Sequence, residues 1–141
     1  MADNVAATQN LFRIWNSRDF ESLIPFVTDD IEWVPATMSA VEGGSFHGVA
    51  ELREFFDEWA HTWTKWEIEP HDVRDLDEQV LVLGHVRAEG RGSGLRLDQP
   101  VAYLFEFRDG LLARGTTFFD QDEARDAARG RGEGQARGTT A

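Results

Sequence analysis

The stretch VLVLGHVRAEGRGSGLRLDQPVAYLFEFRDGLLARGTTFF, residues 80–119, decides the fold class of this chain. Apolar and polar residues alternate along it with a period near two, which is typical of half-buried β-strands. Asp109-Gly110 is the strongest hairpin signal in the sequence. Short turns between consecutive strands favour an antiparallel meander. We therefore predict four strands, at approximately Trp66–Asp75, Gln79–Arg91, Leu95–Phe107 and Leu111–Phe119.

The first half of the chain predicts helices instead. Asp3 and Asp19 are suitable N-caps for a first and a second helix. Pro25 removes a backbone donor, so the second helix should be short or kinked. The third helix is predicted from one apolar stripe at helical spacing, formed by Leu52, Phe55, Phe56, Trp59 and Trp63.

Three further segments complete the predicted order. Alternation predicts a strand at Ile31–Pro35, and the small residues of Met38–Gly48 predict a loop. Asp120-Gln121-Asp122-Glu123 resembles a capping box, so a last helix should begin near Asp120 and fade by Gly130.

Composition limits the function classes. The chain has 141 residues, a length typical of one domain, which we place at residues 1–129, with a disordered Gly- and Arg-rich tail at 130–141. There are no cysteines, which excludes disulfides, thiolate metal sites and a cysteine nucleophile. A net charge of −12 disfavours binding to nucleic acid or to an anionic membrane. The sequence shows no secretory signal and no apolar run of membrane-spanning length, so we expect a cytoplasmic protein.

Three segments resemble a known family. NSRDFESLIPFVTDDIEW, FHGVAELREFFDEW and FEFRDGLLARGTTFFDQDEA are similar to the opening, the third helix and the final hairpin of SnoaL-like proteins, within the nuclear transport factor 2-like superfamily. The resemblance implies an α+β cone, in which three N-terminal helices pack on a strongly curved, mostly antiparallel sheet and a short helix follows. It also implies an interior pocket for a small apolar organic ligand, and a homodimer formed through the outer face of the sheet.

Aromatic side chains are the candidate lining of that pocket. Five tryptophans in 141 residues is a high count, and large rings can wall a ligand cavity. Ordinary core packing is the competing interpretation, and it is the stronger one for most of the phenylalanines. Arg114 has its own alternatives, an ion pair with a ligand carboxylate or a surface salt bridge. The predicted pocket residues are Trp15, Trp33, Phe55, Trp59, Trp63, Tyr103, Arg114 and Phe118.

Proton-transfer chemistry has two candidate residues. The resemblance implies a role for an aspartate near the end of the last strand, and Asp120 matches that position, although it also fits a helix N-cap. His85 lies within an apolar strand but shares its predicted face with Arg87 and Glu89, which favours the outer face. The base and the oxyanion tyrosine of ketosteroid isomerases match Pro35 and Leu11, so both functional groups are missing.

No cofactor or metal is predicted, because the four histidines show no metal-binding spacing. Three hypotheses remain from the sequence. The chain is a cofactor-independent cyclase or isomerase that abstracts a proton from an apolar carbonyl substrate, a ligand-binding protein without chemistry, or a structural dimer whose cavity is filled by its own rings.

Overall fold

A computed structural model describes residues 3–35, 45–90, 92 and 94–128 of the chain. Its helical elements are α1 (Asn4–Asn16), α2 (Phe20–Leu23), the 3-10 helix η1 (Ile24–Phe26), α4 (Gly48–Thr62) and a last helix over residues 121–128. Its strands are β1 (Val27–Val34), β2 (Phe46–His47), β3 (Trp63–Leu76), β4 (Gln79–Gly90), β5 (Arg96–Arg108) and β6 (Leu111–Phe118).

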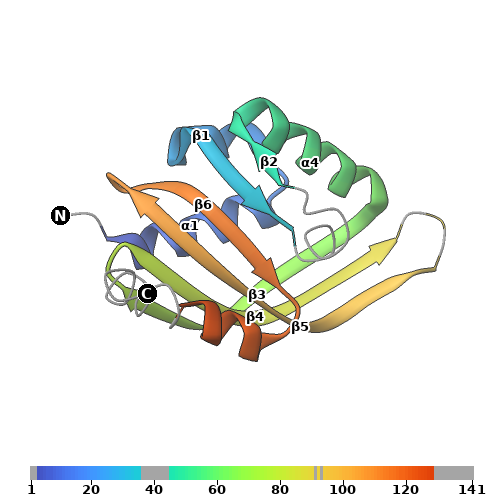
Figure 1. Cartoon of the computed structure of the whole chain (residues 1–141). Coiled ribbons are helices and arrows are strands. Elements are labelled where there is room, and N and C mark those ends of the chain that lie inside the picture. The colour runs from blue at the N-terminus through green and yellow to red at the C-terminus, as the bar shows by residue number, and fades with distance from the viewer. Residues whose placement is uncertain (1–2, 36–44, 91, 93, 129–141) are drawn as a thin grey trace.

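The strands form one six-stranded sheet in the order β2-β1-β6-β5-β4-β3 (Figure 1). The predicted meander of β3, β4, β5 and β6 is confirmed, with antiparallel pairing throughout. β1 pairs in parallel with β6 and antiparallel with the two-residue β2. The fold is therefore the predicted α+β cone with a mostly antiparallel sheet, and the sheet stays open between its edge strands β2 and β3.

Local sequence signals set the helix boundaries. The Asp3 carboxylate accepts a hydrogen bond from the Ala6 N–H at 3.0 Å, and the Asp19 carboxylate accepts one from Ser22 at 3.3 Å. Both predicted caps are thus present. Pro25 ends the α-helical geometry of the second helix after one turn, and the chain continues as η1.

The third helix differs from its prediction at its C-terminal end. α4 stops at Thr62, and Trp63 is the first residue of β3 rather than the last of the helical stripe. A β-branched residue, Thr64, and period-two alternation begin at this point, which favours extended backbone. The predicted loop from Met38 and the predicted tail lie largely or wholly outside the described residues.

The pairing of β3 with β4 is irregular near the middle of both strands. The β3–β4 register shifts between Pro70 and Asp72, next to the pair that Pro70 makes with Gly84. A Cβ atom at Gly84 would lie 2.2 Å from the Glu69 carbonyl oxygen, so this close backbone approach requires glycine. Bulges and glycines are the usual means of curving a sheet.

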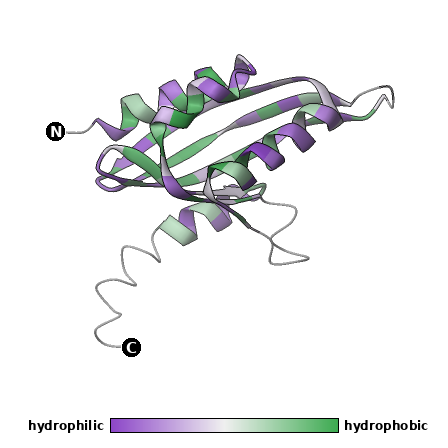
Figure 2. Cartoon of the chain, turned by 90° about the horizontal axis from the view of Figure 1, so that it is seen from above, coloured by the Kyte–Doolittle hydropathy of each residue, from purple (hydrophilic) through white to green (hydrophobic). Residues whose placement is uncertain are grey.

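The two faces of the sheet carry separate apolar clusters. On the inner face, the amphipathic helices α1 and α4 (Figure 2) bury residues such as Leu11, Phe12 and Leu52 against the strands. On the outer face, Ala124 and Ala128 of the last helix pack on a smaller cluster, which also contains Leu81, Leu83, Ala102 and Leu104. The side-chain amide of Gln121 donates to the carbonyls of Gly84 in β4 and Val101 in β5, at 3.2 and 3.3 Å, and so connects this helix to the sheet.

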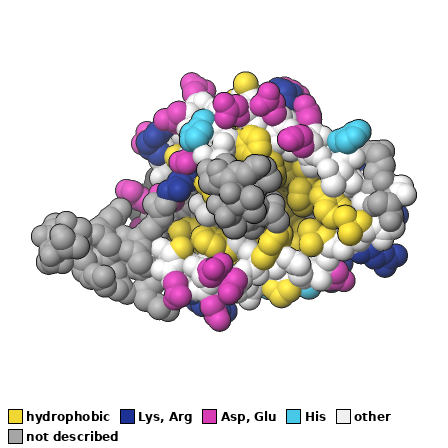
Figure 3. Space-filling view, turned by 45° about the vertical axis from the view of Figure 1, so that its right-hand side comes forward, with side chains coloured by type: hydrophobic (Ala, Val, Ile, Leu, Met, Phe, Trp, Pro, Cys, Tyr) yellow, Lys and Arg dark blue, Asp and Glu magenta, His cyan; other side chains and the backbone are white. Residues whose placement is uncertain are grey.

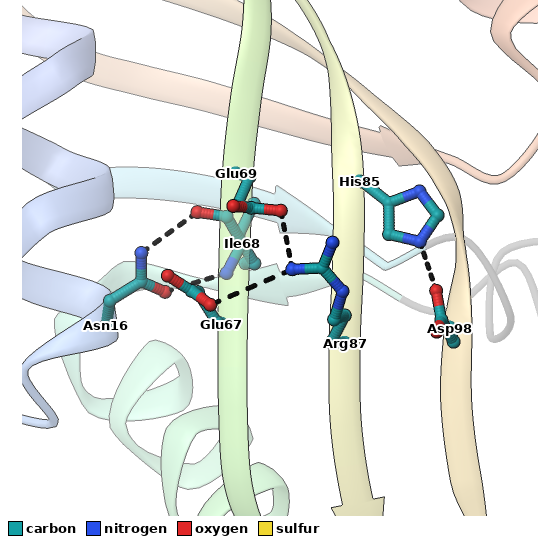
Figure 4. A network of polar contacts seen from close by, with 7 residues as sticks. All are labelled: Asn16, Glu67, Ile68, Glu69, His85, Arg87 and Asp98. Atoms are coloured by element: carbon teal, nitrogen blue, oxygen red, sulfur yellow. Dashed lines mark hydrogen bonds and ion pairs between the residues drawn. The ribbon is translucent and has the colours of Figure 1, made fainter.

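At the free edge of β3, one side chain takes the place of a neighbouring strand. The Asn16 amide donates to the Ile68 carbonyl at 2.9 Å and accepts from the Ile68 N–H at 3.0 Å (Figure 4), as a neighbouring strand would. Within the described part of the chain, no helix combines the length and the apolar character needed to cross a bilayer.

Candidate ligand cavity

A cavity of about 410 Å³ lies between the helices and the concave face of the sheet. Its volume falls within the range of small-molecule sites, roughly 300–1,000 Å³. Aromatic and aliphatic side chains from α1, α4, β1, β3, β5 and β6 line it, and β4 contributes one residue, Val86. The wall includes Leu11, Phe12, Trp15, Trp33, Leu52, Phe55, Trp59, Trp63, Leu97, Val101, Tyr103, Phe105 and Leu112.

Burial distinguishes a closed end from an open end. Residues at the starts of β1 and β6, such as Val27 and Leu112, are 5% and 4% exposed. Wall residues at the opposite ends of the strands, including Leu97, Gln99 and Phe119, are partly or largely exposed. In Figure 3, hydrophobic side chains gather near the centre of the face shown, and charged side chains surround them. A ligand would therefore enter past the ends of β1 and β6.

Aromatic rings pack against one another around the Trp15 side chain. Its ring centroid lies 6.5 Å from that of Trp33, 6.1 Å from that of Phe55 and 6.2 Å from that of Trp59. Gly115 makes room for this cluster, because a Cβ atom there would lie 2.5 Å from the Trp33 ring. The wall is thus a contiguous aromatic surface rather than a set of separated rings.

Several hydrogen-bond donors in this wall have no acceptor. The indole nitrogens of Trp15, Trp33 and Trp59 are buried and have no hydrogen-bond partner among the described residues. Trp66, which is not part of the wall, differs, because its indole donates to the Trp15 carbonyl at 3.1 Å. An unsatisfied buried donor costs about 1–3 kcal/mol.

Only one ionisable side chain is among the wall residues that the structure describes. Tyr103 is 5% exposed, and its burial raises the pKa of the phenol, which keeps it protonated. Gln99 and Thr117 are the other polar members. The described wall contains no carboxylate, histidine, lysine or arginine.

The structure brings six of the eight predicted pocket residues together. These are Trp15, Trp33, Phe55, Trp59, Trp63 and Tyr103. The other two are corrected. Arg114 lies on the outer face, with Nε 3.4 Å from a Glu32 oxygen, and Phe118 packs on the outer cluster. The physical reason is a β-bulge where β6 leaves Leu112, since the extra residue turns Arg114 to the face opposite Leu112.

The two predicted catalytic residues lie outside the cavity wall. The Asp120 carboxylate is exposed and accepts from the Asp122 and Glu123 N–H groups at 2.8 and 3.3 Å, as an N-cap does. His85 lies on the outer face and bonds Asp98, which lowers the pKa of that carboxyl (Figure 4). Both side chains thus have partners of their own outside the described wall.

The sequence analysis missed Gln99 and Thr117. For Gln99 a signal was present, because it has the same parity as Tyr103 in β5. For Thr117 the polar–apolar alternation indicates the opposite face, because Thr117 follows the bulge in β6. Among the described residues there is also no cluster of three or more His, Cys, Asp or Glu residues that could bind a metal ion.

Several solved structures superpose on this chain over most of its length. An NTF2-like protein of unknown function from Burkholderia pseudomallei superposes with a TM-score of 0.75 at 19% identity, over 87% of this chain and 95% of that one. TerC, co-crystallised with polyporic acid, gives 0.72 at 21% identity, over 89% and 98%. A putative SnoaL-like polyketide cyclase from Jannaschia sp. gives 0.73 at 18% identity, over 89% and 90%. At these identities the likeness concerns the fold.

Comparison with curated proteins finds no match. The profile of the SnoaL-like domain matches residues 8–115, which include α1, α4 and most of the sheet. The three segments that suggested this family in the sequence all overlap the matched region. The chain therefore belongs to the SnoaL-like domain family.

Proposed function

We propose that this protein binds a small, uncharged and largely apolar molecule in its cavity, without acid–base chemistry on it. The observation that carries the proposal is the composition of the wall. A space of about 410 Å³ is bounded by aromatic and aliphatic side chains, and its one ionisable group is held neutral by burial. This favours the second of the three hypotheses from the sequence.

The same wall sets the character of the ligand. A charged group moved into this space would lose its hydration without gaining an ion pair, because the described wall offers no counter-charge. An apolar molecule instead gains about 25 cal/mol for each Å² of surface that it removes from water.

Proton abstraction from a carbonyl substrate needs a base within hydrogen-bond reach. Asp120 and His85 are not among the described wall residues, and the Tyr103 phenol is too weak a base while protonated. A cyclase or isomerase remains the second candidate, because structural relatives include a protein called a putative polyketide cyclase.

Deuterium exchange at the carbon next to the carbonyl of 1-indanone separates the two candidates. We expect no rate above buffer, and a catalysed rate would overturn the proposal of a non-catalytic protein.

Binding itself is tested with 9-fluorenone, a neutral tricyclic ketone. We expect it to raise the melting temperature and to quench tryptophan fluorescence, since four tryptophans line the cavity. Leu97→Glu places a carboxylate in the cavity wall and should weaken binding at least tenfold. Leu95→Glu is the matched control, because Leu95 is 56% exposed and outside the wall, and it should leave the affinity within twofold. Equal affinities for the two variants would place the ligand elsewhere.

The homodimer implied by the resemblance also remains a proposal. The last helix covers Leu81 and Leu83 on the outer face, so a partner subunit would meet the charged part of the sheet around Arg87. Sedimentation equilibrium at low and high salt tests this arrangement, because an interface rich in ion pairs should weaken as salt rises.

A further inference from the structure

Tyr103 of β5 brings a hydroxyl to the cavity wall, beside the Trp33 ring, whose buried indole has no hydrogen-bond partner among the described residues. We propose that Tyr103, supported by Thr117, is the polar anchor of the cavity and selects an uncharged ligand that carries a hydrogen-bond acceptor, such as a carbonyl or ether oxygen. This inference rests on the proposed function, because it specifies the ligand of the same cavity.

Packing fixes the position of the Tyr103 ring. Its centroid lies 5.1 Å from that of Phe12 of α1, 5.7 Å from that of Phe105 and 6.3 Å from that of Trp33 of β1. Contacts with three elements leave the ring little freedom to turn away from the cavity. A fixed donor is a better basis for selectivity than a mobile one, because less conformational entropy is lost on binding.

Thr117 brings a second hydroxyl to the same place. It stands directly opposite Tyr103 in the β5–β6 ladder, so the two side chains leave the same face of the sheet. Directly paired residues have Cβ atoms about 4.5–5.5 Å apart. Both side chains belong to the cavity wall. A ligand that contacts Tyr103 therefore lies next to the position of Thr117 on the same face of the sheet.

Hydrogen-bond accounting favours an acceptor on the ligand. Tyr103 is 5% exposed, and it belongs to the cavity wall. Burial keeps this phenol protonated, so it can donate. The nearby Trp33 indole is also a donor without an acceptor. The wall therefore holds surplus donors, which a ligand oxygen would satisfy.

The same surroundings argue against a charged ligand. An anion would need a cation, and the described wall has no lysine or arginine. A cation would need open ring faces around it. The rings instead lie against one another, with Trp15 and Phe55 stacked at 21° and Trp15 and Trp33 at 28°. The wall therefore favours a ligand whose hydrogen-bond acceptor is uncharged.

The test uses three probes of one shape. Fluorene lacks the acceptor, 9-fluorenone carries a carbonyl, and 9-fluorenone-2-carboxylate adds a negative charge. Dissociation constants are measured by tryptophan quenching for the wild type, Tyr103→Phe, Thr117→Val and Thr116→Val. Thr116 is the matched control for Thr117, since it is the adjacent residue and pairs with Leu104 of the outer cluster.

We expect the wild type to prefer 9-fluorenone over fluorene about tenfold, the effect of one buried hydrogen bond, and to bind the carboxylate most weakly. Tyr103→Phe should remove the preference while fluorene still binds, and Thr117→Val should reduce it about threefold. Thr116→Val should leave it unchanged. Equal binding of fluorene and 9-fluorenone, or a preference that survives in Tyr103→Phe, would overturn the anchor and leave the proposed function intact. Failure of all three probes to bind the wild type would contradict both.

Discussion

The inner and outer faces of the sheet use alternate residues of the same strands, yet they differ in almost every property. In β5, Val101, Tyr103 and Phe105 face the cavity, whereas Asp98 and Ala102 face outward. The inner face is aromatic and encloses a space that its side chains do not fill. The outer face is covered by ion pairs and by one short helix. Stability and ligand binding should therefore respond to different faces.

The ion pairs on the outer face are exposed and contribute little to stability. Arg87 bonds the Glu69 carboxylate at 2.6 Å and lies 3.9 Å from a Glu67 oxygen (Figure 4). These side chains are about half exposed, and ion pairs of that kind contribute about 0–1 kcal/mol. Charges on the outer face thus keep the sheet surface polar, while the inner face holds the apolar surface that drives folding.

The largest effect should come from a substitution at Gly84, where β4 lies close to the backbone of β3. Gly84→Ala places a Cβ atom 2.2 Å from the Glu69 carbonyl oxygen, so the backbone of β3 or β4 must shift. We expect a loss of about 3 kcal/mol in the free energy of unfolding by urea denaturation, together with loss of 9-fluorenone binding. Gly94→Ala is the control, because Gly94 has φ +70° but open space around it, and it should cost only about 1 kcal/mol. Equal losses would show that backbone freedom, and not the close approach at Gly84, is what matters.

A smaller effect, confined to the outer face, should follow Ala124→Asp. Ala124 is fully buried against the sheet, so the new carboxylate must either lose its hydration or push the last helix away. We expect about 2 kcal/mol of destabilisation, with 9-fluorenone affinity within twofold of the wild type. Glu123→Asp adds an aspartate at an exposed position of the same helix and should change neither quantity. A large drop in affinity for Ala124→Asp would mean that the two faces are coupled.

Local patterns in the sequence explain why the fold was predictable. Asp3 and Asp19 cap their helices, and the Asp109-Gly110 turn sets the final hairpin, because each acts over a few residues. Long-range pairing is different. The parallel contact of β1 with β6 joins segments about 80 residues apart in the sequence, and no local signal encodes it.

The candidate site was predictable only where alternation is uninterrupted. Tyr103 follows the regular period of β5, and it lies in the described cavity wall. Arg114 and Phe118 follow a bulge that reverses the faces of β6, and a one-residue insertion cannot be recognised from a polar–apolar pattern. Thr117 was missed for the same reason, since before the bulge its parity predicts the outer face.

The smallest effect at neutral pH concerns Tyr103, the one ionisable side chain among the described residues of the cavity wall. Tyr103 is the only tyrosine of the chain, so tyrosinate absorbance reports on this residue alone. Its pKa is raised by burial in the folded protein, whereas in the unfolded chain it should be about 10. A raised folded-state pKa means that folding favours the protonated phenol. That stabilisation is complete below about pH 10 and is lost as pH rises further, so the protein should unfold in alkali as Tyr103 ionises. Asp98 on the outer face behaves in the opposite sense. His85 lowers the pKa of Asp98, so that contribution is lost in acid.

The measurement is a pH titration of tyrosinate absorbance with tryptophan fluorescence recorded in parallel. In urea, absorbance should rise near pH 10, and in the native protein it should rise only together with the fluorescence change that marks unfolding. Tyr103→Phe should resist alkali better than the wild type, because it has no phenol to ionise. An absorbance rise near pH 10 with native fluorescence would mean that water reaches the hydroxyl. In that case the inner face would be hydrated like the outer one, and the contrast between the two faces would not extend to Tyr103.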